Sequence, residues 1–192
     1  CQRSLRIEDK VLSHKTILNE ISRAKDSLIT PQAYLEAAGR DNRLVLIGQA
    51  YSLYQEKLKK ADAMDFDDLI CNTVHLFLEC PDVLSYFQNK FRYIMVDEYQ
   101  DTNHAQYMLV KLLSQQSQNL CVVGDDDQSI YKFRGATIEN ILSFEKTFPR
   151  AHVVRLEQNY RSTQTILDAA NAVIANNAER KGKTLWTENP KG

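Results

Sequence analysis

Three carboxylates follow closely on an apolar stretch near the middle of the chain. Residues 91–96 are apolar apart from one Arg, which is the pattern of a buried strand. Asp97, Glu98 and Asp101 come directly after it. Acids at the carboxyl end of a parallel strand usually face a ligand. An aspartate there can hold Mg²⁺, directly or through water, and an adjacent glutamate can orient or deprotonate an attacking water molecule. The alternative is that these acids are simply solvated at a turn.

Two further stretches share this design of an apolar run followed by a polar loop. Residues 119–123 lead into a loop that contains Gln128, and residues 152–156 lead into a third polar loop. Helical patterns at residues 105–113 and 138–148 are long enough to form crossovers between parallel strands. In an open parallel sheet, ligands bind beyond the carboxyl ends of the strands. We therefore predict an α/β fold in which three polar loops meet at one edge of the sheet.

The first third of the chain reads as helices, with no strand pattern between them. Thr30 followed by Pro31 is typical of a helix start, and residues 44–58 form a further helical segment. An apolar stripe with helical spacing precedes them, made of Ile17, Leu18, Ile21 and Leu28. Residues 1–60 hold 11 Lys and Arg against 7 Asp and Glu, a balance of +4. This surface could meet phosphate backbone, or it could be an ordinary helical surface with scattered charge.

Asp65 has the position of a helix cap. We expect the helix to run through Leu78, with Asp68 near the positive end of its dipole. One face of this helix is predicted to carry Phe66, Leu69, Ile70, Thr73 and Phe77, four of which are apolar.

Composition excludes several classes of protein. No run approaches the length of a membrane span, and no signal peptide is visible. The four cysteines lack the paired spacing of a zinc site, and Cys121 lies in a candidate core strand, so reduced thiols are expected. The expected setting is cytoplasmic and nucleoid-associated.

Three motifs in a fixed order carry a resemblance to a known family. They are Asp-Glu-Tyr-Gln-Asp at 97–101, Gly-Asp-Asp-Asp-Gln-Ser-Ile-Tyr-Lys-Phe-Arg-Gly-Ala at 124–136 and Gln-Asn-Tyr-Arg-Ser at 158–162. Together they resemble the motor motifs of superfamily-one DNA helicases of the UvrD/Rep/PcrA group, the PcrA branch above all. The likeness covers essentially the whole chain. It implies a partial helical inserted subdomain at 1–60, the carboxyl-terminal part of a RecA-like motor domain at 61–156, and the start of a second motor domain at 157–192.

The resemblance also implies roles in nucleotide chemistry. Asp97 is expected to hold Mg²⁺ through its water shell, and Glu98 to act as general base. Gln128 is expected to sense the γ-phosphate of ATP, or else to bond loop backbone. Arg161 resembles the arginine that reaches the γ-phosphate from the second motor domain, with a surface ion pair as its alternative. Tyr160 resembles the residue that stacks on adenine, with core packing as its alternative.

A second set of residues is expected to bind DNA. Tyr131, Phe133 and Arg134 lie in the same loop as Gln128, where aromatic rings offer stacking and the Arg can hold phosphate. Relatives often have Trp where this chain has Phe133. Phe66 could touch a base or be a core aromatic. Because Gln128 and Phe133 are five residues apart, one loop could couple phosphate state to base stacking.

One family motif is missing. These enzymes carry a Gly-x-x-x-x-Gly-Lys-Ser/Thr loop that cradles phosphate. The sequence Gly182-Lys183-Thr184 does not supply it, because the position five residues earlier is Asn177. We therefore expect an internal fragment of a longer helicase, inactive by itself, whose strands lack a neighbour and could self-associate through an exposed sheet edge.

The predicted function is that of an ATP-dependent DNA helicase, translocating 3′ to 5′ on single-stranded DNA, opening duplex junctions, and working with repair or replication proteins. Two alternatives remain. Asp125, Asp126 and Asp127 together with the acids at 97–98 could form a two-metal nuclease site, although this leaves the aromatic and Arg residues unexplained. A helicase-like scaffold without hydrolysis would explain the missing loop, but has no need of Glu98.

Overall fold

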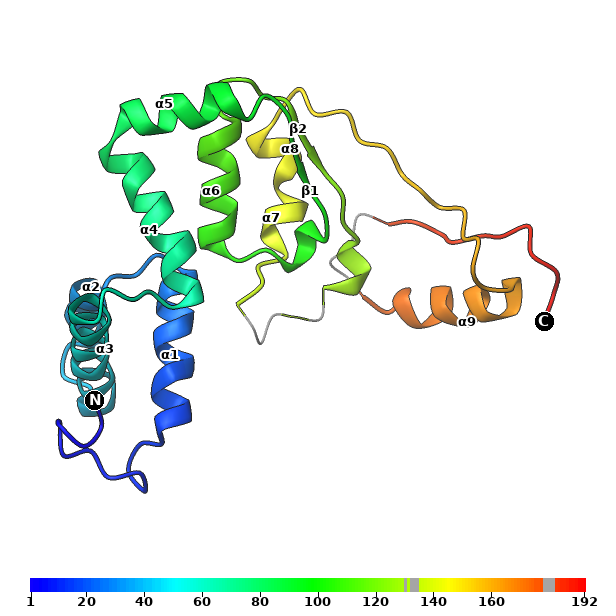
Figure 1. Ribbon diagram of the computed structural model, residues 1–192. Helices are drawn as coiled ribbons and strands as arrows, with labels where there is room; N and C mark the ends of the chain where they lie inside the picture. The colour runs from blue at the N-terminus through cyan, green and yellow to red at the C-terminus, as the bar shows by residue number, and fades with distance from the viewer. Residues whose placement is uncertain (130, 132–134, 178–181) are drawn as a thin grey trace.

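The computed structural model describes residues 1–129, 131, 135–177 and 182–192, and it is mainly helical (Figure 1). In chain order its elements are α1 (His14–Asp26), α2 (Pro31–Ala38), α3 (Asn42–Lys60), α4 (Phe66–Glu79), α5 (Pro81–Lys90), β1 (Ile94–Val96), the 3-10 helix η1 (Tyr99–Asp101), α6 (His104–Ser114), β2 (Leu120–Val122), η2 (Asp126–Gln128), α7 (Glu139–Leu142), α8 (Phe144–Thr147) and α9 (Gln164–Ile174). Helices α1–α3 form one lobe, helices α4–α8 lie around the strands, and α9 stands at the other end with the carboxyl-terminal segment.

Capping side chains set where the helices of the amino-terminal lobe begin. Ser13, Thr30 and Asp41 each accept a hydrogen bond from a backbone N–H in the first turn of the helix that follows. These bonds satisfy donors that the helix itself leaves unpaired. The predicted cap at Thr30 is confirmed, with Pro31 as the first helical residue. The helix predicted at residues 44–58 is α3.

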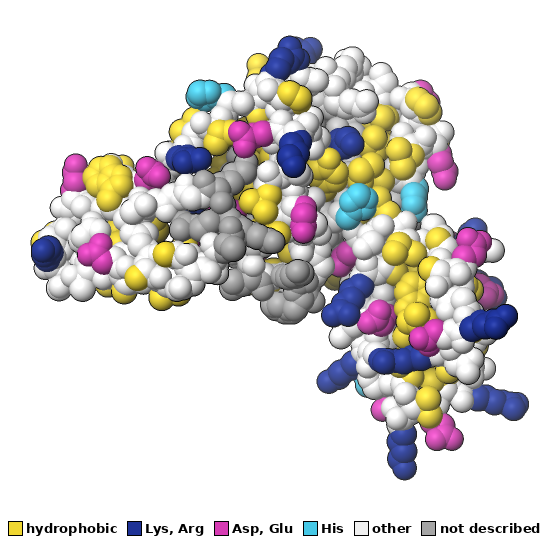
Figure 2. Space-filling model, turned by 180° about the vertical axis from the view of Figure 1, so that it is seen from behind, with side chains coloured by type: hydrophobic (Ala, Val, Ile, Leu, Met, Phe, Trp, Pro, Cys, Tyr) yellow, Lys and Arg dark blue, Asp and Glu magenta, His cyan; other side chains and the backbone are white. Residues whose placement is uncertain are grey.

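The core of this lobe lies between α1 and α3. Its buried residues are Ile7, Leu12, Ile17, Ile21, Ala24, Ile47, Ala50 and Tyr51. The predicted stripe is right for Ile17 and Ile21 but wrong for Leu18 and Leu28. Leu18 is 48% exposed, because it is turned away from the face that Ile17 presents to α3. Leu28 lies beyond the end of α1 with a positive φ of 58°. Lys and Arg side chains project from several sides of this lobe (Figure 2).

Helix α4 starts after Asp65, as predicted. Asp65 and Asp68 form a capping box, in which each side chain accepts a hydrogen bond from the backbone of the other. The predicted apolar face is wrong in part, because the buried positions are Asp68, Cys71, Val74 and Phe77. These residues face α1 and α6, whereas Leu69 is 49% exposed and Phe66 is 89% exposed.

The sheet among the described residues consists of β1 and β2, which are parallel and joined through α6. The mixed α/β class is therefore confirmed. The buried strand predicted at residues 91–96 is shorter than expected. Met95 pairs in register with Cys121 on a face that no described element covers, and Met95 is 79% exposed. The expectation that Cys121 lies in the core is likewise wrong, since its thiol is exposed.

The third predicted strand does not form. Residues 152–156 are extended but unpaired, and Val153, Val154 and Leu156 are 46%, 67% and 81% exposed. A strand needs a partner for its backbone N–H and C=O groups, and an apolar run alone does not provide one. The helix predicted at residues 138–148 is interrupted at Ser143, where α7 ends and α8 begins.

The carboxyl-terminal segment returns alongside the chain that precedes α9 (Figure 1). Gln158 and Trp186 form an isolated parallel bridge, closed by hydrogen bonds from the Asn159 N–H to the Trp186 carbonyl and from the Trp186 N–H to the Glu157 carbonyl. Within the described ranges, no helix combines the length and the apolar character needed to cross a lipid bilayer.

Candidate active site

The acidic residues after β1 are held in a tight turn. Asp97 and Glu98 are both exposed, and Glu98 has a left-handed backbone with φ of 51°. The Glu98 N–H donates to Asp97 Oδ1 at 2.9 Å. Tyr99, which is fully buried, donates its N–H to the Val123 carbonyl at 2.9 Å and thereby ties the turn to the end of β2. The two carboxylates thus project from the carboxyl end of β1 on a fixed backbone.

Gln100 connects the two strand ends through its side chain. Its Nε2 donates to Glu98 Oε2 at 2.7 Å, and its Oε1 accepts from the Asp125 N–H at 2.9 Å. Gln100 itself is only 1% exposed, and both bonds are part-buried. Gly124 makes this approach possible, because a Cβ there would lie 2.6 Å from Gln100 Oε1. Gln100 of the acidic motif thus bonds the loop after β2.

The loop after β2 is organised by Asp125. Its carboxylate accepts the Asp127 N–H at 3.0 Å and Gln128 Nε2 at 2.7 Å. Lys183, from the carboxyl-terminal segment, forms an ion pair with Asp125 and lies 3.8 Å from Asp127 Oδ2. Partial burial of Asp125 favours its neutral form. The hydrogen bonds from Lys183 and Gln128, together with the positive charge of Lys183, outweigh this effect and lower the pKa of Asp125.

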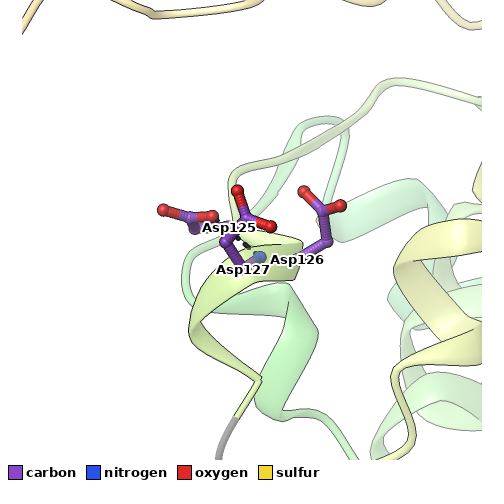
Figure 3. Close-up of side chains that lie close together, drawn as sticks. All are labelled: Asp125, Asp126 and Asp127. Atoms are coloured by element: carbon purple, nitrogen blue, oxygen red, sulfur yellow. Dashed lines mark hydrogen bonds between the residues drawn. The ribbon is translucent and has the colours of Figure 1, made fainter. Parts of the chain in front are cut away.

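The three aspartates of this loop lie together on the turn after β2 (Figure 3), with carboxylate oxygens within 4.8 Å of one another. Asp125 already accepts hydrogen bonds on both of its oxygens, and the Lys183 ammonium supplies positive charge to Asp125 and Asp127. A metal ion would have to displace these contacts. The geometry therefore gives no support to the nuclease alternative.

Tyr160 and Arg161 lie in the turn before α9 and are exposed, Tyr160 to 78%. The Asn159 side chain accepts the Arg161 N–H at 2.9 Å, and the Tyr160 hydroxyl donates to Gln158 Oε1 at 2.9 Å. The alternative prediction, that Tyr160 packs in the core, is therefore wrong. The structure does not bring these two residues to the acids after β1.

A cavity of about 210 Å³ does connect the loop after β2 with α9. Its walls come from Asp125, Asp127 and Gln128 on one side and from Ala170, Asn171, Ile174, Lys183 and Leu185 on the other. The third predicted polar loop, residues 157–162, pairs with Trp186 instead. Two of the three predicted loops therefore meet at the sheet edge, and the carboxyl-terminal segment joins them through Lys183.

Of the residues predicted to bind DNA, the structure describes Phe66 and Tyr131. Phe66 stands at the start of α4 beside a cavity of about 280 Å³, lined also by residues of α1 and by Tyr54. It is not a core aromatic, given its 89% exposure. Tyr131 is 38% exposed, and Phe133 and Arg134 lie outside the described residues.

Sequence reasoning missed the part that Lys183 takes in the site. The Gly-Lys-Thr sequence around Lys183 was considered only as a phosphate-binding loop, which it does not form. Its partner Asp125 lies 58 residues away in the sequence. The one available signal was charge complementarity between this Lys and three consecutive aspartates, which does not identify a pair.

Comparisons with known proteins agree with the motifs. Residues 1–149 match the UvrD/REP helicase N-terminal domain, and residues 154–192 match the UvrD-like helicase C-terminal domain. The chain is 56% identical over 186 residues to ATP-dependent DNA helicase PcrA of Bacillus subtilis strain 168, 55% over 186 residues to that of Staphylococcus aureus strain Mu50, and 55% over 189 residues to that of Leuconostoc citreum.

These alignments cover 97% or 98% of the chain but 25% of each relative, so the chain spans about a quarter of the length of the curated relatives it matches. The motif order, the paired strand ends and these matches lead to one assignment: the chain belongs to the UvrD/REP helicase family.

Proposed function

We propose that this chain is part of an ATP-dependent DNA helicase, which couples ATP hydrolysis to movement along single-stranded DNA. The observation that carries the proposal is the hydrogen-bonded line from Glu98 through Gln100 and Asp125 to Gln128, across the carboxyl ends of two parallel strands. The PcrA relatives are named as ATP-dependent DNA helicases, which supports both the nucleotide and the nucleic acid as ligands.

The acids after β1 would perform the hydrolytic chemistry. Asp97 would hold Mg²⁺, a role that suits an exposed carboxylate because Mg²⁺ prefers oxygen ligands. The metal, when bound, supplies charge neutralisation on the phosphates. Glu98 orients the attacking water and accepts its proton, and the Gln100 bond fixes where that carboxylate lies.

Three further residues would contact the nucleotide. Gln128 faces the γ-phosphate and reports its loss, although its amide now donates to Asp125. Tyr160 stacks on adenine and Arg161 stabilises charge on the γ-phosphate, both from the second motor domain. Their exposure supports these roles, because each side chain is accessible to a ligand.

The proposed domains follow the family. Residues 1–60 form a helical inserted subdomain, 61–156 the carboxyl-terminal part of a RecA-like motor domain, and 157–192 the start of a second one. The parallel strands and the two family matches, which meet between residues 149 and 154, support this division.

The DNA partner is a single strand next to a duplex junction, and the direction of travel is 3′ to 5′. Phe66, Tyr131, Phe133 and Arg134 bind it by stacking and by phosphate contact. The exposed ring of Phe66 supports this role. Proteins of DNA repair or replication are the expected partners. The isolated chain lacks the Gly-Lys phosphate loop in its sequence and is expected to be inactive without it.

Glu98→Gln tests the proposal in the chain extended to the length of its relatives. A fluorescent ATP analogue should still bind, because the amide keeps the shape of the carboxylate. ATP turnover should fall by roughly 10²- to 10⁴-fold, because the amide cannot accept the proton. Glu188→Gln makes the same change at an exposed position away from the strand ends and should leave turnover intact. Turnover by Glu98→Gln at the rate of the unmodified protein would remove Glu98 from the mechanism.

A further inference from the structure

Lys183 is buried more deeply than a surface lysine. Its side chain is 19% exposed, and it pairs with Asp125, whose side chain is 25% exposed. A second carboxylate, Asp127, lies 3.8 Å away with a side chain that is 9% exposed. Such a partly buried pair resists screening by salt better than an exposed pair does. This contact joins the carboxyl-terminal segment to the loop after β2.

Asp125 passes the effect of this contact on to Gln128. Lys183 and the Asp127 N–H bind Oδ1 of Asp125, while Gln128 Nε2 donates to Oδ2 at 2.7 Å. The orientation of one carboxylate therefore decides where the Gln128 amide points. With Lys183 in place, that amide is directed toward Asp125. Without Lys183, Oδ1 of Asp125 keeps the bond from the Asp127 N–H alone, so the carboxylate that accepts the Gln128 amide is held less firmly.

Asp125 is also connected to the acids after β1, through Gln100. The Asp125 N–H donates to Gln100 Oε1 at 2.9 Å, and Gln100 Nε2 donates to Glu98 Oε2 at 2.7 Å. Both bonds involve Gln100, which is 1% exposed. Movement of the Asp125 backbone would therefore shift the side chain that fixes Glu98.

Lys183 in turn is fixed to α9. The Asn171 side chain donates to the Leu185 carbonyl at 2.9 Å and accepts the Leu185 N–H at 3.1 Å. Leu185 is two residues along the chain from Lys183. The two hydrogen bonds between Asn171 and Leu185 therefore make the lysine follow any displacement of α9. The cavity of about 210 Å³ between α9 and the loop after β2 leaves room for such a displacement.

We infer that Lys183 is a positioning residue, which links the position of α9 to the orientation of Gln128 and Glu98 through Asp125. The closed ion pair holds Gln128 on Asp125, and its opening releases the Gln128 amide toward nucleotide. The inference rests on the proposed function, since it concerns the same hydrolytic site. It assigns to the Lys of Gly182-Lys183-Thr184 a carboxylate partner in place of a phosphate.

The test measures ATP hydrolysis, with and without single-stranded DNA, in the chain extended to the length of its relatives. Lys183→Ala should change kcat by roughly tenfold while the KM for ATP stays within about twofold, because the inference places the lysine on Asp125 and not on the nucleotide. Lys183→Arg can still pair with Asp125, so its kcat should stay close to that of the unmodified protein. Lys191→Ala removes an exposed lysine of the same segment and should leave both constants as they are.

A double-mutant cycle with Asp125→Asn separates positioning from general loss of structure. If Lys183 acts through Asp125, the double variant should be no more affected in kcat than Asp125→Asn alone. Additive effects, or a kcat of Lys183→Ala equal to that of the unmodified protein, would overturn the inference. Failure of the proposed function looks different, because Glu98→Gln would then hydrolyse ATP normally whatever the Lys183 variants do.

Discussion

At the scale of the residue, Asp26 shows how burial changes an acid. It lies at the end of α1, half-buried, and accepts a hydrogen bond from Asn103 Nδ2 at 2.5 Å. Burial raises the pKa of Asp26 to about 6, and repulsion from Asp67 adds to the shift. Gly135, with φ of 85°, comes so close that a Cβ would lie 2.5 Å from Asp26 Oδ2. Asp26 therefore links α1 to the loop that carries the proposed DNA-binding residues.

This raised pKa has a consequence for stability. A group whose pKa is raised by folding favours the folded state when protonated, so the chain should lose stability as pH rises from about 4 through about 6. Asp26→Asn keeps an acceptor for Asn103 and removes the charge. At pH 7 it should raise the free energy of unfolding by about 1 kcal/mol, allowing for partial solvent screening.

Urea unfolding at a series of pH values checks this prediction. Between pH 4 and 6, the fall of the free energy of unfolding with pH should become shallower in Asp26→Asn. Asp62→Asn changes an exposed acid and should keep the pH dependence of the parent chain. An unchanged slope in Asp26→Asn would contradict the assignment.

At the scale of the element, a buried lysine joins α1 to α4. Lys25 is 2% exposed, and its Nζ lies 2.6 Å from Asp65 Oδ2 and 2.8 Å from Asp68 Oδ1. Tyr54 of α3 donates to Asp65 at 3.0 Å, so three helices meet at this cluster. Both acids belong to the capping box of α4. The start of α4, and with it the exposed ring of Phe66, is therefore held from the amino-terminal lobe.

Lys25→Ala should lower the free energy of unfolding by roughly 3–5 kcal/mol, because it leaves buried carboxylates without their cation. Lys60→Ala removes an exposed ion pair with Glu56 and should leave the stability close to that of the unmodified chain. The measurement is the midpoint of chemical unfolding of each variant. Equal midpoints for the two variants would mean that the Lys25 cluster does not hold α4.

The contrast between helices and strands shows what local sequence can determine. Helices α1–α4 and α6 were predictable because their caps and periodicity lie within each segment. Residues 152–156 looked like a strand, but a strand depends on a partner elsewhere in the chain, and none pairs with them in the described ranges. On α4, the spacing identified a helix, while its buried face depended on where α1 and α6 lie.

The same distinction applies to the candidate site. The acids after β1 and the polar loop after β2 could be located from sequence, since each directly follows an apolar run. The Gln100 bridge and the Lys183 ion pair join residues 25 and 58 positions apart. Sequence spacing does not encode such contacts, so only the structure reveals them.

At the scale of the whole molecule, the two-stranded sheet has an open face and open edges as far as the described residues go. Met95 is 79% exposed on β1, and its register partner Cys121 is exposed on β2. Unpaired strand edges with apolar side chains favour association with another chain. We expect the isolated chain to self-associate there at high concentration.

Light scattering tests this expectation, with a mass above that of the 22.1 kDa chain as the predicted result. Met95→Lys should shift the distribution toward monomer, because a charge opposes edge pairing. Met64→Lys places the same charge at another exposed methionine, 59% exposed, and should have no such effect. A monodisperse monomer of the parent chain at high concentration would contradict the prediction.

The whole account depends on the strand-end acids belonging to a DNA-dependent ATPase. The most direct measurement is ATP hydrolysis with and without single-stranded DNA, comparing this chain with the chain extended to the length of its relatives. The account predicts that the extended protein hydrolyses ATP and is stimulated by DNA, while this chain alone is silent. An extended protein that is folded but silent in both conditions would contradict the account and favour a scaffold without hydrolysis.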